Sequence, residues 1–273
     1  MLAGGVIMDN KLVIGMPTLV EYDSLQENID LCIDLGLDFI EINMNLPQFQ
    51  PDRLDILKLK EYQKKHGIFF TFHLPEELDI ANFNYRVSNA YLNVVKDVIE
   101  IAESIKSPII NMHMNLGIYF TLPTKKEYLY KKYESSYIKT ISNFANFINQ
   151  LLEDSNTKLS IENTGIYDKD YIISALNELI QYNNIVLTWD IGHDYSSGCK
   201  DEYYIRNNLH KLKHMHIHDA INSNNHLPLF SGNIDIKDKL TIALETKSTC
   251  VIETKTVEGL KESVNKLRDK GKE

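Results

Sequence analysis

The chain has 273 residues, of which 43% are hydrophobic and 25% charged, a composition typical of a soluble globular protein about the size of one α/β barrel. The formal net charge of −9 argues against a general nucleic-acid-binding or membrane-binding surface, although it is compatible with a local basic groove. The three cysteines, Cys32, Cys199 and Cys250, follow no disulfide spacing, which favours a reducing compartment.

The start of the chain carries no recognisable targeting signal. Residues 1–11, MLAGGVIMDNK, contain no basic region and only a short apolar run, so we do not expect a signal peptide. No apolar stretch of the sequence approaches the roughly 20 residues of a membrane span. We therefore predict a cytoplasmic protein with one domain over residues 1–273, in which residues 1–10 are either disordered or a cloning addition.

Predicted strands and predicted helices alternate along the chain. The predicted strands are residues 13–17, 38–45, 67–75, 107–115, 158–165, 185–193, 213–219 and 249–255. The predicted helices are residues 24–36, 52–67, 87–105, 136–154, 171–183, 201–212 and 257–271. This alternation implies right-handed parallel crossovers, and eight β/α units favour a closed barrel over an open sheet. The sequence therefore predicts a single (β/α)8 TIM barrel.

Two connections that follow predicted strands are unusually long. Residues 113–134 are rich in tyrosine and lysine, and residues 219–236 follow the seventh strand. Long connections on the active face of a barrel often cover substrate. For the first segment, a lid and an amphipathic helix start with exposed tyrosines remain equal alternatives. We expect the pocket to be shaped by loop residues, among them Glu41, Asn43, Tyr119 and Phe120.

In six predicted strands, the short apolar run ends in a side chain that can bind a metal. These residues are His73, His113, Glu162, Asp190, His216 and Glu253. Parallel α/β barrels place their chemistry at the carboxyl ends of their strands, so we expect the six side chains to converge. Positions two apart in a strand share a face, and the residues two before these ligands are mostly polar as well. Imidazoles and carboxylates that converge in this way suit Zn²⁺, Mn²⁺ or a similar divalent ion.

Five motifs in the second half of the chain resemble those of one known group of proteins. In order, IENTG, WDIGH, HIHD, HLPLFSGNID and IET resemble the motifs of xylose-isomerase-like TIM barrels, which include sugar isomerases, sugar epimerases and the endonuclease IV group. The resemblance extends from the strand that ends in His73 to Glu253. It implies a four-ligand centre for Zn²⁺ or Mn²⁺, with Mg²⁺ or Co²⁺ as alternatives. The implied ligands are Glu162, Asp190, His216 and Glu253.

The endonuclease IV group uses further ligands for additional zinc ions. The residues that match them are His73, His113, His193 and His226. Where that group has an aspartate, two residues before the last of these histidines, this chain has Asn224. A neutral amide is a weaker zinc ligand than a carboxylate, so we expect a weak third metal position. We interpret His66, His210 and His214 as hydrogen-bonded core residues, and the role of His218 stays open.

The arrangement predicts a reaction class. One ion held by two glutamates suits proton transfer next to a carbonyl through an enediolate, with Glu162 and Glu253 as acid and base. Several ions suit phosphoester hydrolysis of the AP endonuclease type. The loops at residues 45–51 and 74–79 carry few basic or aromatic groups for binding DNA. We therefore predict a metal-dependent isomerase or epimerase of a sugar or related polyol or keto compound, phosphorylated or not, with the hydrolase as the alternative.

Two further classes are disfavoured by the sequence. A binding protein with a vestigial site would be expected to have lost a ligand, yet the four-ligand set is intact. Schiff-base chemistry would rest on Lys255, the lysine nearest to a predicted strand end. The expected partner is a small carbohydrate. The substrate itself, the number of ions and the formation of homo-oligomers are left open.

Overall fold

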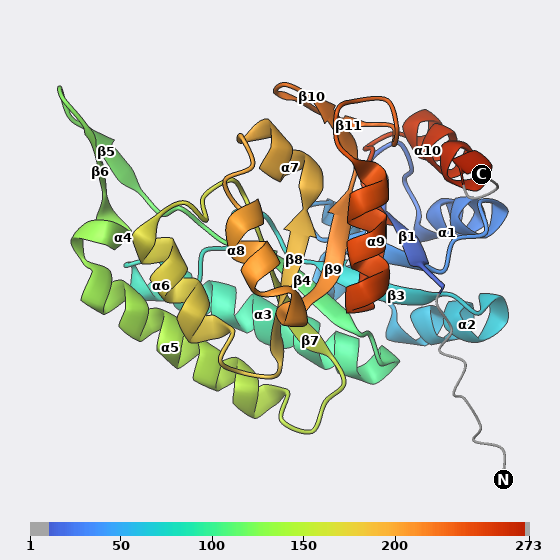
Figure 1. Ribbon diagram of the computed structural model, residues 1–273. Helices are drawn as coiled ribbons and strands as arrows, with labels where there is room; N and C mark the ends of the chain where they lie inside the picture. The colour runs from blue at the N-terminus through green and yellow to red at the C-terminus, as the bar shows by residue number, and fades with distance from the viewer. Residues whose placement is uncertain (1–10, 271–273) are drawn as a thin grey trace, which may run out of the picture.

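The computed structural model describes residues 11–270 and is built around a closed barrel of parallel strands (Figure 1). The strands follow chain order around the barrel, and the first pairs with the last. They are β1 Val13–Pro17, β2 Phe39–Asn43, β3 Phe69–His73, β4 Ile109–His113, β7 Lys158–Glu162, β8 Ile185–Asp190, β9 Leu212–Ile217 and β12 Thr249–Ile252. The predicted (β/α)8 barrel is confirmed, whereas the expectation for residues 1–10 falls outside the described residues.

Helices cover the outside of the barrel. They are α1 Leu25–Asp34, α2 Ile56–His66, α3 Tyr85–Ile105, α4 Leu129–Lys132, α5 Glu134–Leu151, α6 Asp170–Leu179, α7 Ile191–Ser196, α8 Glu202–Asn207, α9 Ile236–Thr246 and α10 Val257–Lys270. Short 3₁₀ turns are formed by η1 Pro47–Phe49, η2 Pro51–Arg53 and η3 Leu209–Lys211. Within residues 11–270, no helix combines the length and apolarity that a membrane crossing requires.

Local sequence explains several of these boundaries. Ser24 forms a capping box with Glu27 at the start of α1, and Asp55 accepts two backbone N–H groups at the start of α2. Gly67 ends α2 in a left-handed conformation, with φ of 71°. The sequence prediction missed α9, because its polar composition hides a narrow buried face that includes Ile236, Lys239, Ile242 and Ala243.

Both long connections contain an antiparallel hairpin. One is formed by β5 Tyr119–Thr121 and β6 Lys126–Tyr128, and the other by β10 Asp219–Ile221 and β11 Asn224–Leu227. The β5–β6 hairpin projects from the body of the molecule next to α4 (Figure 1). Tyr119 and Phe120 are 41% and 58% exposed. The segment after β4 therefore forms a projecting hairpin that was not expected, followed by the helix start with an exposed tyrosine, Tyr133, that was one of the two alternatives.

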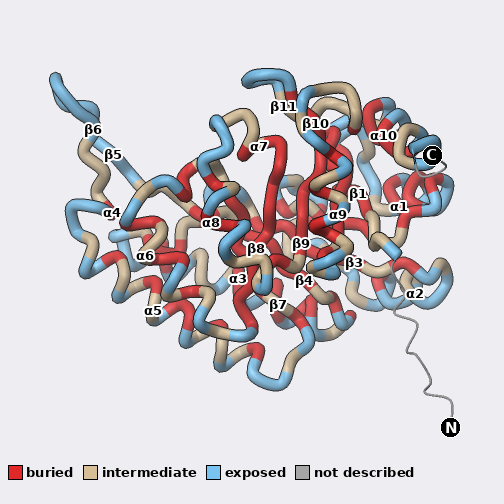
Figure 2. The backbone as a smooth tube through the Cα atoms, in the orientation of Figure 1, coloured by how far each residue is buried: buried red, intermediate tan, exposed pale blue. Residues whose placement is uncertain are grey.

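The barrel wall has an apolar outer face and a polar inner face. Phe72, Met112 and Trp189 are buried on the outer face, as strand alternation predicts, and the barrel is surrounded by buried helix faces (Figure 2). The inner row is polar and hydrogen-bonded across strands. The Ser160 hydroxyl lies 2.5 Å from that of Thr188, and Thr188 donates to the Asn111 amide oxygen at 2.6 Å. A polar interior of this kind leads from the middle of the barrel to its carboxyl end.

Candidate metal centre

Four of the sequence-predicted ligands converge at the carboxyl end of the barrel. Glu162 ends β7, Asp190 ends β8, His216 lies near the end of β9, and Glu253 follows β12. Each has at most 5% of its surface exposed. The Nδ1 atom of His216 lies 3.2 Å from Glu162 Oε1, 3.4 Å from Glu253 Oε2 and 3.9 Å from Asp190 Oδ2. Three carboxylates therefore surround one imidazole nitrogen.

This donor set is suited to a divalent cation. Both ring nitrogens of His216 are buried and make no aligned hydrogen bond within the described part of the chain, although carboxylate oxygens lie close to them. Burial would lower the pKa of His216, but the carboxylates of Glu162, Glu41 and Glu253 raise it well above its ordinary value. An unpartnered nitrogen that faces several buried carboxylates leaves excess negative charge, which a bound cation would balance.

A second group joins Glu162 to two histidines. His73 Nε2 and His113 Nε2 lie 3.2 and 3.4 Å from Glu162 Oε2. His73 Nδ1 is 2.7 Å from the Leu74 carbonyl oxygen, a contact that would leave Nε2 facing the site. Burial would lower the pKa of His73, but Glu162 raises it to about 8. For Glu162 the directions are reversed: burial would raise its pKa, but His216 and His113 lower it well below its ordinary value.

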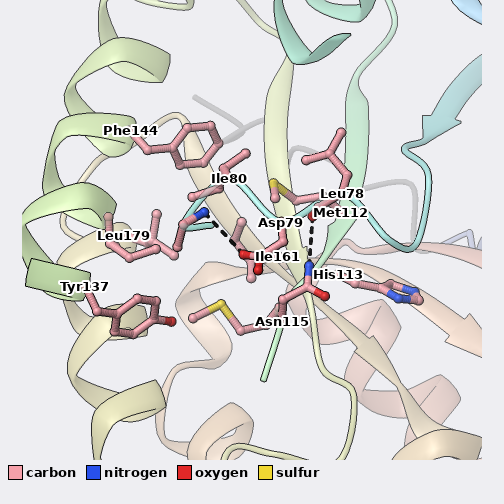
Figure 3. Close-up of a pocket in the computed structure, with 13 residues that line it drawn as sticks. Leu78, Asp79, Ile80, Met112, His113, Asn115, Tyr137, Phe144, Ile161 and Leu179 are labelled. Carbon is pink, nitrogen blue, oxygen red and sulfur yellow. Dashed lines mark hydrogen bonds between the residues drawn. The ribbon is translucent and has the colours of Figure 1, made fainter. Parts of the chain in front are cut away.

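A small cavity behind β4 is not part of this centre. Its volume is about 20 Å³, space for little more than one water molecule. It is lined mostly by apolar side chains, including Ile80, Met112 and Phe144. Figure 3 shows the ring of His113 directed away from these side chains. The cavity therefore has neither the size nor the polarity of a substrate site.

The third predicted group lies at the start of α7 and in the β10–β11 hairpin. The rings of His193 and His226 have centroids 5.1 Å apart, and His193 Nε2 is 3.8 Å from Asp190 Oδ2. Asp190 caps α7 by accepting the backbone N–H of His193 at 2.6 Å. His226 Nδ1 is 2.9 Å from the backbone oxygen of Glu253. Burial and the neighbouring His218 lower the pKa of His226 to about 4.

His218, whose role the sequence left open, supports Asp190. Its Nδ1 accepts the backbone N–H of His226 at 2.8 Å, so Nε2 carries the proton that faces Asp190 at 3.1 Å. A side chain at Gly192 would collide with this ring, because an added Cβ would lie 1.9 Å from His218 Cε1. His218 therefore orients a carboxylate of the centre.

The hairpin brings a different asparagine to the third group than the motif comparison implied. Asn224 is exposed and pairs with Ile221 in the hairpin. The amide nitrogen of the next residue, Asn225, lies 3.2 Å from His193 Nδ1. In this structure, Asn225 occupies the place beside His193.

Glu41 falls within the predicted strand 38–45 but was also expected among the loop residues of the pocket; it lies in the middle of β2 and is 1% exposed. Its Oε1 is 2.8 Å from His216 Nε2, and its Oε2 is 2.9 Å from His214 Nε2. Asn43 also belongs to β2. The alternation of Phe39, Glu41 and Asn43 would have placed Glu41 inside the barrel.

The remaining histidines divide between core and periphery. His214 is a hydrogen-bonded core residue, as expected, since its Nδ1 lies 2.6 Å from Thr249 Oγ1. His66 is partly exposed at the end of α2, and His210 is exposed in the turn before β9, so neither is a core residue. Asn111, one of the polar residues expected to share a face with the ligands, donates its amide N–H to Glu162 Oε2. Lys255, the candidate for Schiff-base chemistry, forms an ion pair with Glu253.

Comparisons with known proteins agree on the fold. A crystal structure of a D-tagatose 3-epimerase-like protein matches with a TM-score of 0.76 and 22% identity, over 94% of this chain and 96% of that one. A structure of the IOLI protein with a binding zinc atom matches with a TM-score of 0.72 and 17% identity, over 94% of this chain and 97% of that one. The uncharacterised protein MJ1614 of Methanocaldococcus jannaschii is 25% identical over 181 residues, 65% of this chain and 67% of that protein.

The family assignment rests on a wider match. A model of the family described as xylose isomerase-like TIM barrel matches residues 29–270. This range includes β2 and every later strand of the barrel, and it contains all the side chains of the centre described above. The chain belongs to the xylose isomerase-like TIM barrel family.

Proposed function

We propose that this protein is a divalent-metal-dependent isomerase or epimerase that moves a proton next to a carbonyl group of a sugar or related polyol. The observation that carries the proposal is the placement of Glu162 and Glu253 around the same nitrogen of His216, at 3.2 and 3.4 Å. Two carboxylates beside one ion can take a proton from a carbon and return it to the same or a neighbouring carbon. The similarity to a D-tagatose 3-epimerase-like protein supports this substrate class.

The cation would be held by the imidazole of His216 and by the three carboxylates that surround it, those of Glu162, Asp190 and Glu253. Zn²⁺ and Mn²⁺ both accept this donor set, and the similarity to a zinc-binding protein supports Zn²⁺. When bound, the ion would polarise the substrate oxygens and favour an enediolate. The carboxyl-end loops would then have to orient a small carbohydrate against it.

The two glutamates differ in their surroundings, which suggests different roles. Glu162 Oε2 is in contact with His73, His113 and the Asn111 amide, so its charge is closely compensated. Glu253 is paired with Lys255 near the surface. Burial would raise the pKa of Glu253, but Lys255 and His216 lower it well below its ordinary value, so Glu253 is ionised, as Glu162 is. We assign Glu253 as first proton acceptor and Glu162 as its counterpart.

A second function is favoured by one observation. His73 and His113 lie beside Glu162, so that glutamate could bridge two ions, which is an arrangement suited to phosphoester hydrolysis. His193 and His226 would extend the site further. The proton-transfer function remains our first proposal, because Glu76 and Glu77, exposed in the loop that follows His73 in the sequence, would repel a phosphate backbone.

Deuterium exchange separates the two functions. The metal-loaded protein is incubated with candidate ketoses and keto-polyols in deuterated water, and the products are examined by NMR. We expect deuterium at the carbon next to the carbonyl. In parallel, an oligonucleotide with one abasic site is tested for cleavage. Cleavage that is abolished by a chelator and by Glu162→Gln, without deuterium incorporation, would refute the isomerase and establish the hydrolase.

A further inference from the structure

A second cavity opens at the opposite end of the barrel from the metal centre. It has a volume of about 390 Å³, within the range of sites for small molecules. It lies where β4, β7, β8, β9 and β12 begin, at the amino end of the barrel. Its lining includes Ile109 and Val186 from the barrel wall. Nothing in the proposed reaction uses this end of the molecule.

The lining of this cavity is positively charged. Four lysines line it, together with one histidine and no carboxylate, and the lysines are Lys158, Lys211, Lys213 and Lys247. Within residues 11–270, none of the four lysines forms an ion pair with an acidic side chain. Four positive charges without a carboxylate in one cavity are not expected by chance in a chain with a net charge of −9.

Three of these ammonium groups are held by neutral oxygens. Lys158 Nζ donates to the Asn184 amide oxygen at 2.8 Å, Lys211 Nζ to the Tyr182 carbonyl at 2.8 Å, and Lys213 Nζ to the Thr246 carbonyl at 3.1 Å. An ammonium group has three donors, so each lysine is positioned while most of its donors stay available. Burial lowers the pKa of Lys211, and the charge of Lys158 lowers it further. The cluster therefore carries uncompensated repulsion that an anion would relieve.

We propose that this cavity binds a small phosphorylated metabolite, with its phosphate held among Lys158, Lys211, Lys213 and Lys247 and its carbon skeleton against Ile109 and Val186. A phosphate carries close to two negative charges at neutral pH and accepts several hydrogen bonds, which suits flexible ammonium groups. The volume of the cavity accommodates such a molecule but not a polymer.

The bound metabolite is a separate ligand and not the substrate of the metal centre. Lys158 and Glu162 lie at the two ends of β7, four residues apart, which corresponds to about 13 Å in an extended strand. The barrel interior between them is filled by buried side chains such as Ser160, Thr188 and His214. One small molecule therefore cannot contact both sites.

Calorimetric titration with pyrophosphate tests this proposal. The variant Lys211→Met/Lys213→Met removes two charges but keeps most of the length of each unbranched side chain. The control Lys60→Met/Lys64→Met removes two exposed charges from α2, outside the cavity. We expect saturable binding to the wild type, at least tenfold weaker binding to the cavity variant, and affinity within twofold of wild type for the control. Binding that is absent from the wild type, or weakened equally in both variants, would overturn the proposal.

Two further variants establish where the anion binds and replace a double variant that does not fold. Glu162→Gln must retain pyrophosphate affinity, because a loss there would mean that the anion binds at the metal centre. If the double variant does not fold, as judged by circular dichroism, Lys247→Asn replaces it. Asparagine tolerates the left-handed backbone at this position, where φ is 54°, and a threefold or greater weakening is expected. Citrate serves as the competing anion, and tighter binding of citrate than of pyrophosphate would refute the phosphate assignment.

Discussion

The carboxylate of Glu41 lies 2.8 Å from Nε2 of His216, while Nδ1 of the same imidazole faces Glu162 and Glu253. Glu41 also contacts His214, whose ring is in turn held by Thr249. If His216 binds a metal through Nδ1, Glu41 is placed to hold the proton on the other nitrogen and to keep the ring oriented. The metal ligand thus depends on a carboxylate from the other side of the barrel.

Replacement of Glu41 should weaken metal binding. Glu41→Gln keeps the shape of the side chain but removes the charge, and loss of such a supporting contact typically reduces affinity about 10–100-fold. Zinc affinity is measured by competition with a chromophoric chelator. Glu77→Gln, which alters an exposed carboxylate, is the control. Equal zinc affinity of Glu41→Gln and wild type would show that Glu41 does not support the centre.

The two glutamates of the centre should be required for turnover. Glu162→Gln and Glu253→Gln each remove an anionic ligand and a possible acid or base, so we expect a loss of activity of at least 10²–10⁴-fold. Melting temperature in the presence of metal should also fall, because bound metal contributes to the free energy of folding. Glu258→Gln on α10 is the matched control. Full activity and metal content in either active-site variant would contradict the proposed centre.

A carboxylate beside His193 should strengthen the third metal position. Asn225→Asp places an anionic oxygen where the amide now lies 3.2 Å from His193 Nδ1. We expect one additional zinc ion per chain by elemental analysis, because His193 and His226 then gain a charged co-ligand. Asn224→Asp has the same charge but lies on the exposed side of the hairpin, so it should leave the metal content unchanged. Three tightly bound ions in the wild type would refute this and favour the hydrolase.

The buried Asp194 should make stability depend on pH. Burial raises the pKa of Asp194 from 3.8 to about 6. The folded state therefore binds this proton more tightly than the unfolded state, so its contribution is complete below pH 3.8 and is lost as pH rises through 6.

Urea denaturation of wild type and Asp194→Asn between pH 4 and pH 7 measures this contribution, because asparagine does not titrate and the other groups cancel in the difference. The wild type should lose about 1–3 kcal/mol relative to the variant over this range. A difference that stays constant with pH would show that Asp194 does not have the raised pKa.

Much of the centre could be predicted from the order of residues alone. Glu162, Asp190 and Glu253 each stand at or just after the end of a strand, and parallel strands of a barrel end at the same face. The strand pattern alone therefore predicts that these three side chains converge, although it specifies none of the contacts between them. The outward packing of Trp189 follows in the same way from the alternation of side chains.

Other features were decided by tertiary structure. Glu41 meets His216 only because the barrel closes and β2 and β9 then face each other across its interior, and no local pattern encodes that closure. His218 became a support for Asp190 because the β10–β11 hairpin folds back and donates the His226 N–H to it. The four lysines of the amino-end cavity come from three parts of the chain, with Lys158 at the start of β7, Lys211 and Lys213 around the start of β9, and Lys247 between α9 and β12. Sequence periodicity assigns the face of each strand, whereas contacts between faces and loops depend on how the whole chain packs.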